Sequence, residues 1–238
     1  KKQKDAGRIK HLGFSAHGNM GVITRFLDKY GDYMEFGQLQ INYLDWKFQN
    51  AKEKVELLTS RNIPVWVMEP LRGGKLAALD PADEQTLKAL RPDEGVPAWA
   101  FRFLQSLPQV TMILSGMSDM AQTKDNMATF ATDKPLDAAE TAALMGIADD
   151  MIKKSALPCT ECRYCTSHCA KGLDIPALIK LYNEHRFTGG GFIAPMVLGT
   201  FAEDKRPAAC VGCRSCEAVC PQSIRISEMM KDFCARLK

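Results

Sequence analysis

The first 130 residues alternate between short apolar runs and longer stretches with helical spacing. Apolar runs at 11–15, 36–42, 63–68 and 110–114 predict strands. Each run precedes a stretch with helical periodicity, and these stretches cover 22–30, 46–61, 98–107 and 118–130. In the second stretch the expected buried stripe consists of Val55, Leu57 and Leu58. Four consecutive strand–helix units predict a parallel sheet with right-handed crossovers.

Periodicity alone does not decide whether this sheet is open or closed. A doubly wound sheet and a barrel both cover the faces of parallel strands with helices. The Gly-x-Gly-x-x-Gly motif of dinucleotide-binding open sheets is absent from the sequence. Its absence weakens the doubly wound alternative without excluding it.

The distribution of cysteine divides the chain. All nine cysteines follow residue 158, and the first 158 residues contain none. This change of composition predicts one domain over 1–152 and a second over 153–238, with residues 153–158 as the connector. In a reducing compartment such a set of thiols indicates metal or redox use rather than disulfides.

Composition and charge narrow the class of protein. The chain has 238 residues, of which 46% are hydrophobic and 25% charged, so it has enough apolar material for a core. A net charge of +3 gives no basis for binding nucleic acid or anionic lipid. No apolar run approaches the roughly 20 residues of a membrane span, and no signal-peptide pattern is present. We therefore expect a cytoplasmic protein with neither nucleic-acid nor membrane partners.

Eight of the cysteines form two copies of one motif. Each copy reads C-x2-C-x2-C-x3-C, and the second copy continues with Pro221. In two-cluster ferredoxins three cysteines of such a run bind one [4Fe–4S] cluster, and the fourth binds the other cluster. Structural zinc sites usually take two pairs of ligands, so zinc is disfavoured. We predict two [4Fe–4S] clusters, one held by Cys159, Cys162, Cys165 and Cys220, the other by Cys210, Cys213, Cys216 and Cys169.

Helices are predicted around these cysteines. Residues 177–187 follow Asp174 and Pro176, which are typical of a helix start, and residues 224–237 form a second helix. Forty residues separate Cys169 from Cys210, too many for a compact bacterial ferredoxin. The segment resembles instead an α-helical ferredoxin.

Four motifs at the predicted strand ends carry a second resemblance. They are HLGFS at 11–15, QLQINYLD at 38–45, VMEPLRGGKL at 67–76, and LSGMS at 114–118 with DN at 125–126. In order and spacing these motifs resemble the aldo-keto reductase family over about residues 8–130. The resemblance implies an α/β fold of the (β/α)8 TIM-barrel type, with strands five to eight present and function at their C-terminal ends.

The same resemblance implies a site for NADP or NAD. The matching positions are Ser15 and Gln40 for the nicotinamide carboxamide, Leu71 and Gly73 for the pyrophosphate loop, and Gly116, Ser118, Gln122, Asp125 and Asn126 for the adenosine. Ala16 stands where the family usually has Asn, Met68 where many members have an aromatic ring, and Gln122 where an Arg is common. Ser15 and Gln40 have an alternative interpretation, as residues that only satisfy backbone groups at strand ends.

The family's catalytic Asp, Tyr, Lys and His belong to the first half of the barrel, so we assign no catalytic residue. We expect these residues upstream of Lys1, unless the half-barrel has lost reductase chemistry. The predicted function is NAD(P)H-linked reduction of a small-molecule carbonyl, or the reverse, accompanied by electron transfer through the clusters. A flavin or a redox partner protein would connect hydride to single-electron chemistry. Equally, the clusters would serve to bind a redox partner or have a structural role. The alternative is a non-enzymatic electron-transfer protein with a barrel-derived docking scaffold.

Overall fold

The computed structural model describes residues 1–17, 20–159 and 161–237. The chain forms two compact units, Lys1–Asp149 and Asp150–Lys238, which are described separately below.

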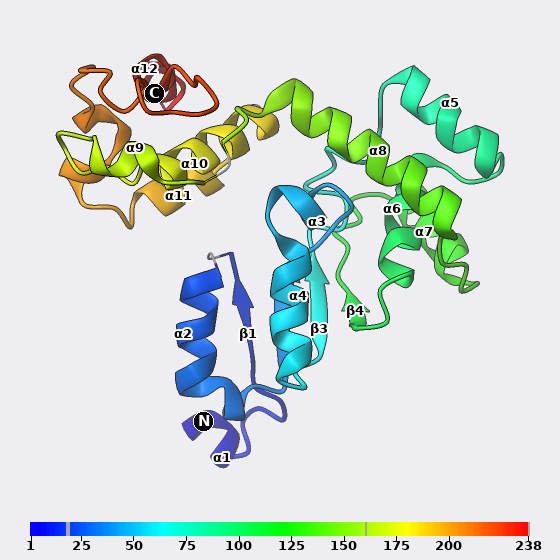
Figure 1. Ribbon diagram of the computed structural model, residues 1–238. Helices are drawn as coiled ribbons and strands as arrows, with labels where there is room; N and C mark the ends of the chain where they lie inside the picture. The colour runs from blue at the N-terminus through cyan, green and yellow to red at the C-terminus, as the bar shows by residue number, and fades with distance from the viewer. Residues whose placement is uncertain (18–19, 160, 238) are drawn as a thin grey trace. The chain divides into compact units, whose positions relative to one another are not determined.

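The first unit contains a four-stranded parallel sheet (Figure 1). Its strands are β1 (Gly13–Ala16), β2 (Phe36–Gln40), β3 (Val65–Met68) and β4 (Val110–Ile113), in the order β1-β2-β3-β4. Ser15 pairs with Gln38, and Gln40 pairs with Met68. The predicted parallel sheet is confirmed, and because all its strands are parallel, their C-terminal ends lie at one edge.

Helices lie between the strands along the chain. They are α1 (Lys2–Asp5), α2 (Met20–Tyr30), α3 (Asp45–Phe48), α4 (Ala51–Ser60), α5 (Pro81–Leu90), α6 (Val96–Gln105), α7 (Met120–Phe130) and α8 (Ala138–Ser155), with a short 3-10 turn at Gly31–Tyr33. The predicted single helix over 46–61 is wrong, because Asn50 has a φ of 54° and separates α3 from α4. Leu57 is only half-buried, and Lys54 takes its place in the buried stripe with Val55 and Leu58.

The two faces of the sheet differ in cover. On one face Leu39, Val65 and Val67 are fully buried, and α4 packs against β2 and β3. On the other face the Phe36 and Trp66 rings stack at 3.7 Å. Gln38, Trp66 and Met112 share that face through the strand register, and Met112 is 44% exposed.

The second unit is helical. It contains α9 (Tyr164–Ser167), α10 (Ile175–Thr188), α11 (Ile193–Leu198) and α12 (Ile226–Arg236), with 3-10 turns at Glu203–Lys205 and Pro207–Ala209. The Asp174 side chain caps α10 by accepting from the Ala177 N–H, and Pro176 lies in the first turn, as predicted. Leu178, Ile179 and Phe233 form part of the core between α10 and α12.

The predicted connector over 153–158 begins too early. Lys153 and Lys154 belong to α8, because no helix-breaking residue occurs before Pro158.

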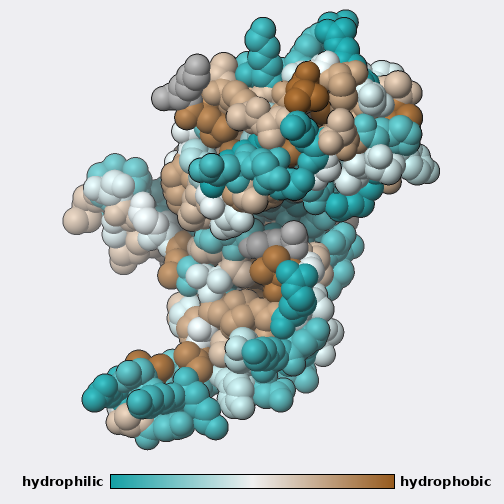
Figure 2. Space-filling view, turned by 90° about the vertical axis from the view of Figure 1, so that its left-hand side faces the viewer, coloured by the Kyte–Doolittle hydropathy of each residue, from teal (hydrophilic) through white to brown (hydrophobic). Residues whose placement is uncertain are grey.

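Among the described residues no helix is long and apolar enough to cross a bilayer. Strongly hydrophobic residues form small separate patches on the face shown in Figure 2.

Candidate functional site

A pocket of about 330 Å³ lies where β3 and β4 end. Parallel strands bring their C-terminal loops to one edge, and both loops contribute to the lining of this pocket. Seven of the nine residues predicted for the dinucleotide lie together here: Leu71, Gly73, Gly116, Ser118, Gln122, Asp125 and Asn126. We call this the strand-end pocket.

The loop after β3 forms one wall of the strand-end pocket with its backbone. Arg72, Gly73 and Gly74 have φ values of 49°, 61° and 86°, so the chain turns through three successive left-handed residues. Glycine adopts this conformation without strain. Because Gly73 and Gly74 lack side chains, a ligand can approach this backbone closely.

The opposite wall is held by hydrogen bonds around the start of α7. The Ser118 N–H donates to Gln122 Oε1 at 2.8 Å, and the Gln122 N–H donates to Asp119 Oδ1 at 2.8 Å. Asn126 Nδ2 donates to Ser115 Oγ at 3.3 Å. These contacts fix the side chains of Gln122 and Asn126 at the pocket.

Ser15 and Gln40 lie outside the strand-end pocket, on β1 and β2. Ser15 is level with Gln38, two residues before Gln40, so all three residues share the less covered face of the sheet. Ser15 is exposed and Gln40 is half-buried.

A buried polar network at the ends of β2 and β3 was not predicted from the sequence. Asp45, with no exposed surface, lies at its centre and accepts hydrogen bonds from Gln40, Asn42 and Arg72. Asn42 also donates to the Glu69 carbonyl at 3.0 Å. Asp45 and Arg72 are 27 positions apart, and charged residues usually lie at the surface, so no local pattern identified the pair.

The eight motif cysteines line two pockets in the second unit. Pocket I is lined by Cys159, Cys162, Cys165 and Cys220. Pocket II is lined by Cys210, Cys213, Cys216 and Cys169. The grouping by pocket therefore coincides with the crossed grouping expected from the motif, in which the fourth cysteine of each run joins the other set.

The donors and surroundings of both pockets fit an iron–sulfur cluster. Each pocket offers four thiols among apolar and basic side chains, with Arg163 in pocket I and Lys171 and Arg214 in pocket II. The Leu173 nitrogen donates to the Cys169 sulfur at 3.4 Å, a hydrogen bond of the kind that tunes such clusters. Within the described residues, no three Cys, His, Asp or Glu side chains converge on the position of a single metal ion.

Burial and hydrogen bonding shift the pKa of individual thiols in both pockets. Burial raises the pKa of the Cys159 and Cys165 thiols, and it raises that of Cys216 to about 11. The exposed Cys213 differs, because a backbone hydrogen bond from Ser215 lowers its pKa. Since the metal ligand is the thiolate, cluster binding must release protons from the buried thiols.

Two further features surround the cysteine pockets. Ile226, 1% exposed, lines both pocket I and pocket II.

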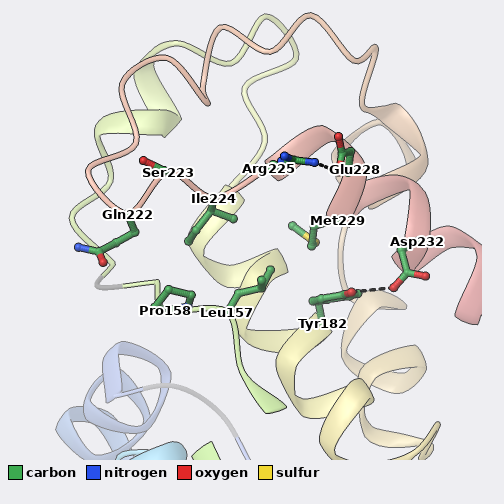
Figure 3. A pocket seen from close by; sticks show the side chains of 10 residues that line it. All are labelled: Leu157, Pro158, Tyr182, Gln222, Ser223, Ile224, Arg225, Glu228, Met229 and Asp232. Atoms are coloured by element: carbon green, nitrogen blue, oxygen red, sulfur yellow. Dashed lines mark hydrogen bonds and ion pairs between the residues drawn. The ribbon is translucent and has the colours of Figure 1, made fainter. Parts of the chain in front are cut away.

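A larger groove of about 420 Å³ shares Gln222 and Ile224 with pocket I. Figure 3 shows its apolar centre at Leu157, Ile224 and Met229, with an ion pair and a Tyr182–Asp232 hydrogen bond at its rim. We call it the pocket I groove.

Comparison with known proteins adds the family to this geometry. The sequence pattern of the "Aldo/keto reductase family" matches residues 1–149. The chain belongs to the aldo/keto reductase family. A "4Fe-4S dicluster domain" matches residues 158–225 of this aldo/keto reductase family chain. These matches confirm the predicted fold class and the predicted iron–sulfur module, whereas the individual dinucleotide residues stay predictions.

Solved structures of aldo-keto reductases resemble the first unit. A thermostable aldo-keto reductase, Tm1743, is 16% identical with a TM-score of 0.50, and the match covers 61% of this chain and 51% of that one. AKR11C1 from Bacillus halodurans is 23% identical with a TM-score of 0.48, covering 61% and 52%. The chain thus spans about half the length of these proteins. No curated protein matches it significantly.

Proposed function

We propose that this chain provides the nicotinamide side of an oxidoreductase that acts on a small-molecule carbonyl and carries electrons through two [4Fe–4S] clusters. The observation that supports this most directly is the strand-end pocket, which gathers seven residues matching the family's dinucleotide positions. Gly73 and Gly74 would accept the pyrophosphate, and Asp125 and Asn126 would contact the adenosine. Ser15 and Gln40 would hold the carboxamide.

The charge of the pocket favours NAD over NADP. Its described lining contains the carboxylates of Glu69 and Asp125 and no Lys or Arg. A 2′-phosphate would face these carboxylates without a cation to pair with, whereas a ribose hydroxyl can donate to them. Gln122, at the position where the family often has Arg, offers an amide instead.

When bound, a nicotinamide supplies a hydride and a cluster supplies single electrons, so a flavin or a redox partner protein must connect the two. The pocket I groove borders pocket I, with which it shares Gln222 and Ile224, so a partner bound in the groove would lie beside that cluster. The proton for the carbonyl oxygen is assigned to the family's catalytic residues in the first half of the barrel.

Cofactor binding tests the proposal. Anaerobic protein with both clusters is titrated with NADH and NADPH, and nicotinamide fluorescence reports the dissociation constants. We expect NADH to bind at least about tenfold more tightly, a difference of about 1.4 kcal/mol. Gly116→Trp, which fills the strand-end pocket, should abolish binding. Gly146→Trp, on the exposed side of α8, is the matched control and should not.

Two outcomes would contradict the enzyme proposal. The first is that neither nucleotide binds, and the second is that Gly116→Trp binds NADH as well as the control does. Reducible clusters without nucleotide binding would favour the second candidate function, electron transfer with a barrel-derived docking scaffold. The pocket I groove supports that candidate, because it is lined by second-unit residues alone and a carrier bound there would lie beside pocket I.

A further inference from the structure

We propose that Asp45 is a positioning residue that turns the Gln40 amide so that its oxygen, and not its nitrogen, faces the nicotinamide carboxamide. This inference rests on the proposed function, because it concerns how the same cofactor is recognised.

The contacts of Asp45 determine the orientation of Gln40. Gln40 Nε2 donates to Asp45 Oδ2 at 2.8 Å. Asn42 Nδ2 donates to the same oxygen at 2.8 Å, and Arg72 Nε lies 3.1 and 3.0 Å from the two Asp45 oxygens. Asp45 has no exposed surface and Arg72 is 4% exposed, so both charges are removed from water and paired.

Asp45 is itself fixed in place. Its backbone N–H donates to Asn42 Oδ1 at 2.8 Å, and Asn42 is anchored to the Glu69 carbonyl at the end of β3. The Arg72 guanidinium lies over the Phe48 ring, 5.4 Å from its centre. The carboxylate therefore cannot turn away from Gln40 without breaking several buried hydrogen bonds.

The chemistry of a carboxylate gives the direction of the amide. An ionised carboxylate only accepts hydrogen bonds, so Gln40 must present its NH2 group to Asp45. Gln40 Oε1 is then at the other side of the amide, where it can accept from the NH2 of the nicotinamide carboxamide. An Asn at position 45 would offer both a donor and an acceptor, and Gln40 could then adopt either orientation.

A ligand pair that differs only at the carboxamide tests this direction. The 3-acetylpyridine analogue of NADH keeps a carbonyl oxygen but has no NH2 to donate. We expect wild-type protein with both clusters to bind NADH about 5- to 10-fold more tightly than the analogue, the effect of one hydrogen bond. In Asp45→Asn this ratio should fall toward one, whereas a general structural defect would weaken both ligands equally and leave the ratio unchanged.

Further variants keep the test decisive. Asp45→Asn removes the carboxylate that faces Arg72 and can impair folding, so the double variant Asp45→Asn/Arg72→Leu, which removes both charges, is measured with it. Gln40→Ala gives the ratio expected when the contact is absent. Gln38→Ala, on the same strand and face, is the matched control and should keep the wild-type ratio.

The outcomes separate this inference from the proposed function. If wild-type protein binds neither ligand, the proposed function fails. If wild-type protein binds both ligands equally, or if either Asp45 variant keeps the full preference for NADH, cofactor binding stands and the role of Asp45 is refuted.

Discussion

The crossed assignment of the cysteines gives a quantitative prediction about iron content. Pocket I takes three cysteines from the first motif and Cys220 from the second, and pocket II takes Cys169 from the first. In a variant with Cys159, Cys162 and Cys165 changed to Ser, pocket I loses three of its four ligands. Pocket II keeps all four, so anaerobic protein should retain about four of about eight irons.

Single changes added to this variant, which lacks three cysteines, then identify the fourth ligand of pocket II. Adding Cys220→Ser should leave the iron content at about four, because pocket I is already lost. Adding Cys169→Ser removes a ligand of the remaining cluster and should lower the iron content toward zero or convert the cluster to a three-iron form. Iron and acid-labile sulfide analysis gives the stoichiometry, and electron paramagnetic resonance of the oxidised and reduced protein identifies the cluster type.

A sequential assignment, with each motif holding one cluster, predicts the reverse. In that case Cys220→Ser would destroy the remaining cluster, and Cys169→Ser would have no further effect. That pattern would refute the grouping derived from the two pockets. Cys234 is a thiol outside both pockets, so Cys234→Ser is the control. It should leave the iron content unchanged both in wild-type protein and in the variant that lacks three cysteines.

Two further predictions concern stability. Gly37→Ala would place a Cβ 2.3 Å from Leu58 Cδ2, and we expect it to lower the free energy of unfolding by about 1–3 kcal/mol in denaturant titrations, an effect that Leu58→Ala should partly remove. Arg91 contacts Glu140 at 2.6 Å and lowers the pKa of that carboxyl. The stabilisation from a lowered carboxyl pKa is complete above the unfolded value of about 4.3 and is lost as the pH falls through the folded pKa. Glu140→Gln should therefore reduce the acid dependence of thermal unfolding, and an unchanged slope below pH 5 would contradict this assignment.

Local patterns predicted the elements in which one face is strongly apolar. The four strands and the helices α6, α7, α10 and α12 agree with their predicted ranges to within two residues at each end. In α5 only Leu87 is fully buried, so this helix has no clear apolar stripe. In α8 the buried apolar stripe is short, consisting of Leu144, Ile147 and Ala148 within an alanine-rich segment.

The candidate sites differ in how far the sequence could define them. Cysteine spacing defines the iron–sulfur module because three thiols separated by two residues act within one loop. The strand-end pocket depended on resemblance, since its residues come from two loops and two helices. The Asp45–Arg72 pair was inaccessible to pattern analysis, because only the fold brings those positions within 3.0 Å of each other.

Ile226 has a consequence for how the two clusters of the second unit take up electrons. Its side chain lines both cysteine pockets, so the two clusters would be separated there by hydrocarbon rather than by water. Charges in such surroundings repel one another more strongly than they do in solvent. An electron accepted by one cluster would therefore make its neighbour harder to reduce, and the unit would charge in two separate steps.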